Sequence, residues 1–199
     1  MKQVTFLVLL LAILAGVSAQ TSPVAAPPPT HKAAFPAGDP LKLDPQFAAD
    51  ASGQWAVQAS ASSQYGATTY SAAQATGAPN IDKHGDDAKA WTPSQPDHGV
   101  ETLTLTFAQP VHAKEVRIRQ SFNPGTITRV EVSSATSAQQ IVFEGPDLTA
   151  YPAYTVGWLV VPFAPTEFLA TSVRVTLDTA KVKGWNEIDA VQLVADKPR

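Results

Sequence analysis

The clearest pattern in the chain is an alternation of apolar and polar residues at a period of two. It is strongest in four segments, which cover residues 103–107, 116–119, 127–132 and 173–177. Each places its apolar side chains on one face and its Thr, Arg or Glu side chains on the other, as a strand does when one face is buried. Weaker candidates cover residues 55–59, 141–143, 158–161 and 188–194. The pattern predicts about eight strands.

Turn-forming residues separate these segments. Pro110 follows the first strong segment, residues 123–125 (Asn-Pro-Gly) separate the second from the third, and residues 145–147 (Gly-Pro-Asp) end a later one. Short strands with this punctuation predict an all-β fold, a jelly-roll β-sandwich of antiparallel strands. No segment carries a sustained apolar stripe at helical spacing, which argues against an α/β nucleotide-binding fold.

One short helix is expected near residue 71. Ser71 and Gln74 match a capping box, in which the Ser side chain accepts from the backbone amide three residues on and the Gln side chain reaches back. Gly77 is expected to close this turn in the left-handed conformation, which glycine adopts without steric cost. The helix serves as punctuation between strands and contributes little to the core.

The N-terminal part of the chain has a different character. Lys2 precedes an apolar run over residues 6–14, and small or apolar residues lie just before Gln20. This pattern is typical of a secretory signal peptide over residues 1–19, with cleavage after Ala19. The alternative is a membrane helix, but the apolar run is too short to span a bilayer core of about 30 Å. We therefore expect a secreted or periplasmic protein that does not insert into the membrane after cleavage.

Residues 20–45 hold seven of the 17 prolines and little apolar periodicity. A Pro- and Ala-rich chain of this kind is typical of an extended, disordered linker. A ligand for a proline-recognition domain is the alternative interpretation. One globular domain is then expected over residues 46–196.

Composition narrows the possible chemistry. The chain has no cysteine, which excludes disulfides, thiolate metal sites and a cysteine nucleophile. It has 14 Lys and Arg against 17 Asp and Glu, a formal net charge of −3, which argues against a nucleic-acid binder with a basic face. Neither Gly-x-Ser-x-Gly nor His-Glu-x-x-His occurs. Without disulfides, an exported domain must be held by its apolar core, alone or with a metal ion.

Two segments carry a resemblance to a known family. Residues 72–79 read Ala-x-x-Ala-x-Gly-Ala-Pro, and residues 185–191 read Trp-Asn-Glu-Ile-Asp-Ala-Val. With the strands between them, they resemble the discoidin-like, galactose-binding-like domains, a group that includes the coagulation-factor type C domains and many bacterial carbohydrate-binding modules. The bacterial extracellular branch matches better than the disulfide-bonded animal branch. The resemblance, over residues 54–195, implies a jelly roll of two packed antiparallel sheets that binds ligands at loops on one end.

The loop of residues 80–87 is the densest cluster of side-chain oxygens, the ligand type that calcium prefers. As an EF-hand it fails, because residue 91, at the twelfth position, is Trp instead of Glu. The resemblance implies a structural calcium ion at a different kind of site. Its expected ligands are the side chains of Asn80 or Asp82 and of Glu187, with the backbone carbonyls of Ala75 and Gly77. An acidic surface loop without metal remains the alternative.

Alternation along the last predicted strand places Glu187 and Asp189 on one face. Two neighbouring carboxylates are unfavourable unless a cation or solvent screens them, so this pair suits either the calcium site or an exposed edge. Imidazoles suit zinc or copper, and three histidines occur near acidic residues. They are His84, His98 and His112. Because their spacing matches no helical metal motif, we interpret them as solvated loop residues.

The aromatic residues suggest a ligand. Trp55 and Trp158 lie within apolar strands and are interpreted as core. Other aromatics lie at strand ends or in loops, where their rings can stack on the apolar C–H faces of sugars while polar neighbours hold the hydroxyls. The candidate ligand-binding residues are Tyr65, Trp91, Arg119, Phe122 and Asn123. For Trp91, as for Trp185, capping of the core is the favoured alternative.

Three functions are consistent with these observations. The first is a secreted or periplasmic non-catalytic binding module for carbohydrate or a cell-surface glycan, in which calcium is structural. The second is a protein–protein interaction or adhesion domain of the same fold, with a cell-surface protein as partner. The third is a small hydrolase, which only the inventory of paired carboxylates supports. No cofactor other than calcium is implied.

Overall fold

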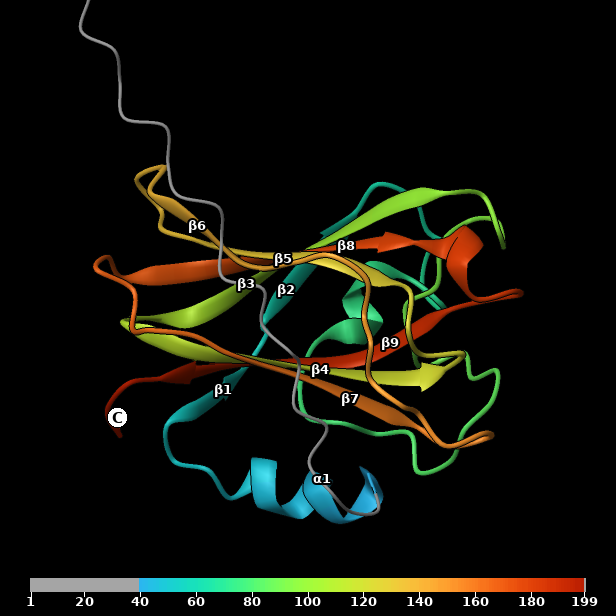
Figure 1. Cartoon of the computed structure of the whole chain (residues 1–199), viewed down its shortest axis with the longest axis horizontal. Helices are drawn as coiled ribbons and strands as arrows, with labels where there is room; N and C mark the ends of the chain where they lie inside the picture. The colour runs from blue at the N-terminus through green and yellow to red at the C-terminus, as the bar shows by residue number, and fades with distance from the viewer. Residues whose placement is uncertain (1–39, 199) are drawn as a thin grey trace, which may run out of the picture.

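In the computed structural model, residues 40–198 are described, and they form a sandwich of two antiparallel sheets (Figure 1). The four-stranded sheet has the order β1–β9–β4–β7, and the five-stranded sheet has the order β2–β3–β8–β5–β6. The strands are β1 Gly53–Trp55, β2 Gln58–Ala61, β3 Val100–Val111, β4 Ala113–Phe122, β5 Ile127–Ser133, β6 Gln139–Glu144, β7 Gly157–Pro162, β8 Ala170–Asp178 and β9 Glu187–Ala195. The predicted all-β jelly roll is confirmed.

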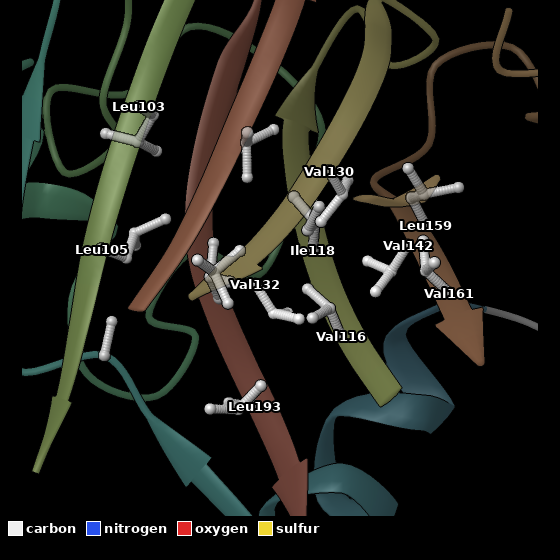
Figure 2. Packing of buried hydrophobic residues seen from close by; sticks show 14 of the residues in the cluster. Leu103, Leu105, Val116, Ile118, Val130, Val132, Val142, Leu159, Val161 and Leu193 are labelled. Atoms are coloured by element: carbon white, nitrogen blue, oxygen red, sulfur yellow. The ribbon is translucent and has the colours of Figure 1, made fainter. Parts of the chain in front are cut away.

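The hydrophobic core lies between the two sheets and uses the alternate residues that the sequence pattern indicated. Leu103 and Leu105 of β3 point into it from one sheet, and Val116 and Ile118 of β4 from the other (Figure 2). All four are fully buried. Burying a side chain of this kind stabilises a fold by roughly 1.5–3 kcal/mol. A domain without disulfides is thus held by the packing of two apolar sheet faces.

The predicted strand over residues 55–59 is two strands in different sheets. β1 pairs with β9 and β2 pairs with β3, and the chain crosses between the sheets at Ala56 and Val57. The Ala56 amide donates to Val191 O in one sheet, and the Val57 amide donates to Thr106 O in the other. Each of the two amides at this corner therefore has a backbone partner, one in each sheet.

Residues 40–45, predicted as the end of the disordered linker, belong instead to helix α1, Pro40–Ala48. Proline suits the first turn, where its missing amide has no helical partner. Leu43 and Phe47, four residues apart, share one side of the helix, which packs on the outer face of the four-stranded sheet (Figure 1). Residues 1–39, which hold the predicted signal peptide and the rest of the predicted linker, lie outside the described residues. Among those described, no helix is long and apolar enough to cross a membrane.

The predicted short helix is a 3₁₀ turn, Ala72–Ala75, and its capping differs from the prediction. The Ser71 hydroxyl donates to Thr68 O, and the Gln74 side chain also donates to Thr68 O, so no capping box forms. The Gln64 side chain accepts from the Ala72 amide instead. Gly77 has a φ of 81°, as expected for the left-handed residue that ends the turn.

Candidate functional site

A small hollow at one end of the sandwich is lined by aromatic and polar side chains. Its walls are Tyr65, Tyr70, Asp86, Thr92 and Trp185, and its volume is about 110 Å³. The Tyr65 ring meets the Tyr70 ring edge-on at 5.4 Å between centroids, and it meets the Trp185 ring at 5.2 Å. Tyr65 is 60% exposed, which is unusual for a large aromatic residue in this otherwise well-packed domain. An aromatic surface is thus available to a ligand.

The segment beneath the hollow is tied to the core. Trp91 is fully buried, forms an isolated bridge with Ile188 of β9 and donates its indole N–H to Ser63 O. Next to it, the Thr92 hydroxyl donates to Asn186 O, and Thr92 O accepts from the Tyr65 amide. The residues around the hollow are therefore held by a rigid base.

A chain of hydrogen-bonded acidic groups lies behind the hollow. The Tyr70 phenol donates a hydrogen bond to the Asp86 side chain. This hydrogen bond raises the pKa of Tyr70 and so favours its protonated form. Glu187 is 1% exposed. Burial and the neighbouring Asp86 raise its pKa to about 8. Glu187 also accepts from the Asp87 amide and the Ser121 hydroxyl. Near neutral pH, Glu187 is a protonated partner that orients Asp86.

A larger groove of about 460 Å³ lies near the hollow, because His84 of its lining is two residues from Asp86 of the hollow. Its lining residues are His84, Phe122, Asn123, Pro124, Tyr151, Pro152, Ala153, Tyr154, Thr155 and Val182. The His84 ring meets the Phe122 ring edge-on at 5.2 Å and the Tyr154 ring at 6.1 Å. Burial lowers the pKa of His84, which favours the neutral imidazole. The groove thus offers apolar rings together with a neutral donor and acceptor.

Backbone strain is concentrated around the hollow and the groove. Among the described residues, five non-glycine residues have a positive φ, and three of them line these two features. They are Tyr70 at 54°, Asn123 at 44° and Tyr154 at 59°. Bulky residues rarely adopt this conformation, which costs about 1–3 kcal/mol and tends to occur at functional sites. Asn123 is held there by its own side chain, which donates to Trp185 O at 2.8 Å.

Three of the five predicted ligand-binding residues lie at this end of the molecule. Tyr65 lines the hollow, and Phe122 and Asn123 line the groove. The prediction is wrong for Trp91 and Arg119, because both side chains are fully buried and neither can reach a ligand. Trp91 caps the core, which was the favoured alternative interpretation of this residue.

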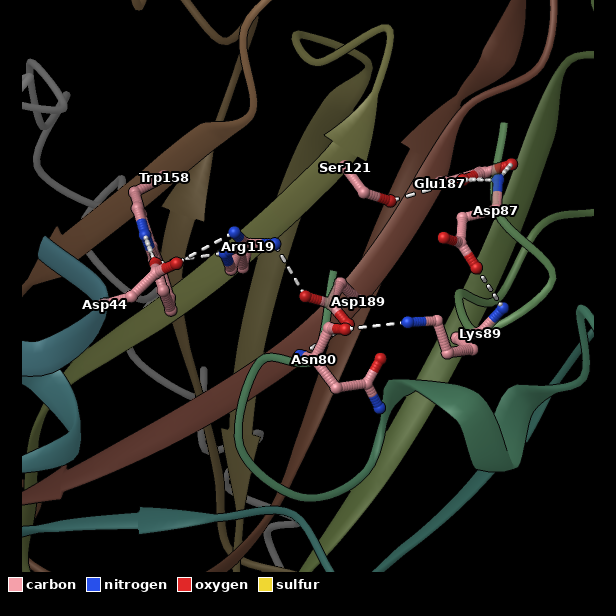
Figure 3. Close-up of polar contacts among 9 residues, drawn as sticks. All are labelled: Asp44, Asn80, Asp87, Lys89, Arg119, Ser121, Trp158, Glu187 and Asp189. Carbon is pink, nitrogen blue, oxygen red and sulfur yellow. Dashed lines mark hydrogen bonds and ion pairs between the residues drawn. The ribbon is translucent and has the colours of Figure 1, made fainter. Parts of the chain in front are cut away.

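Arg119 is the centre of a buried ion-pair network (Figure 3). It donates to Asp189 at 2.6 Å and to both carboxylate oxygens of Asp44, on α1, at 3.0 and 2.8 Å. The same Asp44 accepts from the Trp158 indole, and the Phe47 ring packs edge-on against Trp158. Trp158 is buried as predicted, but under α1 instead of between the sheets. These groups attach the helix to the sheet.

The two carboxylates of the last strand have separate partners. Asp189 pairs with Arg119 and accepts from the Asn80 amide, whereas Glu187 bonds to Ser121 and to the amide of Asp87 (Figure 3). Burial raises the pKa of Asp189 to about 6, although the Arg119 guanidinium opposes this shift. Both are 1% exposed on an interior strand, so the exposed-edge interpretation is wrong.

The expected calcium ligands lie in the segment of residues 75–82 and at the start of β9. They are Ala75, Gly77, Asn80, Asp82 and Glu187. The Lys89 ammonium donates to Asn80 O at 2.9 Å, which places a cation of the protein itself at this loop. Within residues 40–198, no three His, Asp or Glu side chains are grouped so that they could hold a metal ion, and this includes the three histidines. That finding does not cover a site built partly from Asn80 and backbone carbonyls, so structural calcium stays a prediction.

Sequence reasoning missed Tyr154 and the role of Asp86. Tyr154 is 89% exposed in the segment between β6 and β7, where Gly145, Pro146 and Pro152 indicate an irregular loop. An aromatic residue in such a turn-rich loop was the available signal. Asp86 was counted among the acidic residues of the loop, and nothing in the local sequence shows that Tyr70 lies beside it.

Comparison with known proteins identifies the family. The family model described as "Pappalysin-1, SD scarf domain, C-terminal" matches residues 47–198. The chain belongs to this family. The matched residues of this scarf domain span the entire sandwich and the end of α1. A search of curated proteins finds no match.

One solved structure shares the fold of the scarf domain. The N-terminal domain of the single-strand break repair protein XRCC1 matches at a TM-score of 0.50 and 11% identity, over 71% of this chain and 99% of that one. The family 32 carbohydrate-binding module of NanJ from C. perfringens, solved with galactose, matches at 0.46 and 16%, over 71% and 98% of the two chains. At 11% identity, the XRCC1 match shows a shared fold and nothing beyond it.

Proposed function

We propose that this domain is a non-catalytic carbohydrate-binding module that holds a sugar at the hollow. The observation that carries the proposal is the exposed ring of Tyr65 beside the oriented carboxylate of Asp86. Sugar rings have apolar C–H faces that pack on aromatic side chains, and their hydroxyls donate to carboxylates. Tyr65 and Trp185 supply the apolar surface, and Asp86 supplies the acceptor.

The carboxylate geometry supports binding without turnover. Glycosidases need two carboxyl groups about 5–5.5 Å or roughly 6.5–9.5 Å apart, one on each side of the scissile bond. Here Asp86 and Glu187 are joined by a hydrogen bond, and Glu187 is buried behind Asp86. No substrate fits between these two carboxyl groups. Glu187 instead orients Asp86, which is the acceptor for a sugar hydroxyl.

A glycan array followed by calorimetry tests the proposal. We expect wild-type protein to bind at least one glycan at millimolar concentration or below. Tyr65→Ala should weaken that binding about ten-fold, because an aromatic contact is worth roughly 1 kcal/mol beyond its buried area. Leu169→Ala is the matched control, since Leu169 is also half-exposed but borders a separate pocket with Pro110 and His112.

Three outcomes would overturn the proposal. If no glycan binds at millimolar concentration and a stable complex with a cell-surface protein is isolated, the adhesion interpretation replaces it. If wild-type protein cleaves a glycoside and Asp86→Asn abolishes the cleavage, the domain is a hydrolase. Equal loss in Tyr65→Ala and Leu169→Ala would show that the hollow is not the site.

We also propose that the mature protein acts outside the cytoplasm. The charged start, apolar run and small residues of positions 1–19 support this proposal. N-terminal sequencing of the protein from its native host should begin at Gln20. An intact N-terminus in the cytoplasmic fraction would contradict it.

A further inference from the structure

We infer that the groove beside the hollow holds the continuation of the glycan, so that the module recognises an oligosaccharide and not a single sugar. This inference rests on the proposed function, because it extends the same site. It assigns a binding role to His84, Phe122 and Tyr154, whose rings surround the groove.

The sizes of the two features point to this division. Small-molecule sites usually enclose about 300–1,000 Å³, and the hollow, at about 110 Å³, is below that range. The groove, at about 460 Å³, lies within it. The hollow alone therefore grips only part of one sugar ring, whereas hollow and groove together accommodate at least a disaccharide.

The hollow and the groove have no lining residue in common, but two contacts link their linings. Asp86 of the hollow and His84 of the groove are two residues apart in one loop, and the Gly85 amide between them donates to Ser121 O on β4. On the opposite side, Asn123 of the groove donates to the carbonyl of Trp185, which lines the hollow. Because the two linings are connected at both places, one ligand of linked sugars can contact both features.

The groove lining has the chemistry of a sugar subsite. Tyr151 lies against Gly157, where an added Cβ would come within 2.5 Å of its ring. Its hydroxyl is occupied by Asp147 and Gln120, so this residue offers the groove its ring and not its hydroxyl. Tyr154 stands at the rim, 89% exposed and in a strained backbone conformation. An exposed ring held at a backbone cost suits a platform for an apolar sugar face.

Calorimetry with two probes tests the inference. The probes are the best-ranked oligosaccharide from the glycan array and the methyl glycoside of its terminal sugar. We expect wild-type protein to bind the oligosaccharide about ten-fold more tightly than the methyl glycoside, a difference of about 1.4 kcal/mol, because the added sugar gains an aromatic contact. Tyr154→Ala should remove most of that gain and leave methyl glycoside affinity unchanged, whereas Tyr65→Ala should weaken both probes.

A second variant and a folding check keep the test decisive. His84→Ala should repeat the effect of Tyr154→Ala, and both variants should melt close to the wild-type temperature. Equal affinity of wild-type protein for the two probes would overturn the inference and leave the proposed function intact. Equal weakening of both probes by Tyr154→Ala would also overturn it. If neither probe binds wild-type protein, the proposed function itself fails.

Discussion

Two groups of aromatic and polar side chains in this domain look alike in sequence but differ in what covers them. On the outer face of the four-stranded sheet, Trp158 and Arg119 are fully buried under α1, which contributes Phe47 and Asp44. At the loop end, where the hollow and the groove lie, Tyr65 and Tyr154 are 60% and 89% exposed, and other rings meet them only edge-on. The first group is satisfied within the fold, and the second is open to a ligand.

The comparison teaches that the combination of aromatic rings and polar groups does not identify a binding site. Such a combination also attaches a helix to a sheet, as the hydrogen bonds from Arg119 and Trp158 to Asp44 show. The distinguishing features of the loop end are exposure and backbone strain. Both arise from tertiary structure.

The largest expected effect comes from the buried ion pairs. Arg119→Met leaves Asp189 and Asp44 without their cation, and Asp189 has no exposed side-chain surface. Removing one partner of a buried pair typically costs about 3–5 kcal/mol, and urea denaturation should show this loss. Arg129→Met is the control, because Arg129 pairs with Glu131 and Glu144 at the surface and should cost under about 1 kcal/mol. An Arg119 variant that kept its stability but lost glycan binding would move Arg119 into the ligand site.

The next effect concerns Glu187 and pH. Its pKa is raised from 4.5 to about 8 in the folded protein. Between these two pH values, the folded state retains a proton that the unfolded state has lost. Stability therefore falls as pH rises, by up to about 1.4 kcal/mol per pH unit. Measured between about pH 6 and pH 8, the stability of wild-type protein relative to Glu187→Gln should decrease by roughly 2–3 kcal/mol. A difference that is constant with pH would mean that Glu187 is ionised in the folded protein.

A smaller effect should appear at the exposed end. Tyr154 has a φ of 59°, a conformation that glycine adopts without strain. Tyr154→Gly should therefore be more stable than Tyr154→Ala by up to about 1 kcal/mol, as measured by thermal denaturation. Neither variant should bind the oligosaccharide as tightly as wild-type protein. If the alanine variant is the more stable of the two, the backbone of residue 154 is not strained in the wild-type protein.

The smallest effect should come from calcium. The Lys89 ammonium donates to the carbonyl of Asn80, so a positive charge already lies at the expected calcium site. We therefore expect the melting temperature in millimolar calcium to stay within about 1 °C of that in a chelator. A ligand that binds only the folded state must raise its stability. A clear rise of the melting temperature with calcium, and none with magnesium, would support the predicted metal site.

Local sequence was sufficient for most strands. Alternation in β3 and β8 assigned Leu103, Leu105, Val173 and Val175 to the core, because the side-chain period of a strand is fixed by its backbone. It did not reveal that residues 55–59 cross between sheets, since that depends on which strands lie beside them. The capping box failed for a similar reason, because Thr68 O accepts from both the Ser71 and Gln74 side chains.

The structure shows which of the predicted ligand-binding residues are accessible. Tyr65, Phe122 and Asn123 lie in or beside turns and line the hollow or the groove, and their role in binding stays a prediction. Arg119 was misplaced because α1, which covers it, begins in a proline-rich stretch that resembled a linker. A side chain on the outer face of a sheet is exposed only if no other segment packs there.

By itself, the sequence determined the sheet content, the inward faces of the strands and the absence of any disulfide, because these follow from local periodicity and composition. Tertiary structure decided the rest. It placed α1 over Arg119, brought Tyr70 and Glu187 to Asp86, and left Tyr65 and Tyr154 uncovered. Burial and proximity depend on segments distant in the chain, so no local pattern could specify which aromatic residues remain available to a ligand.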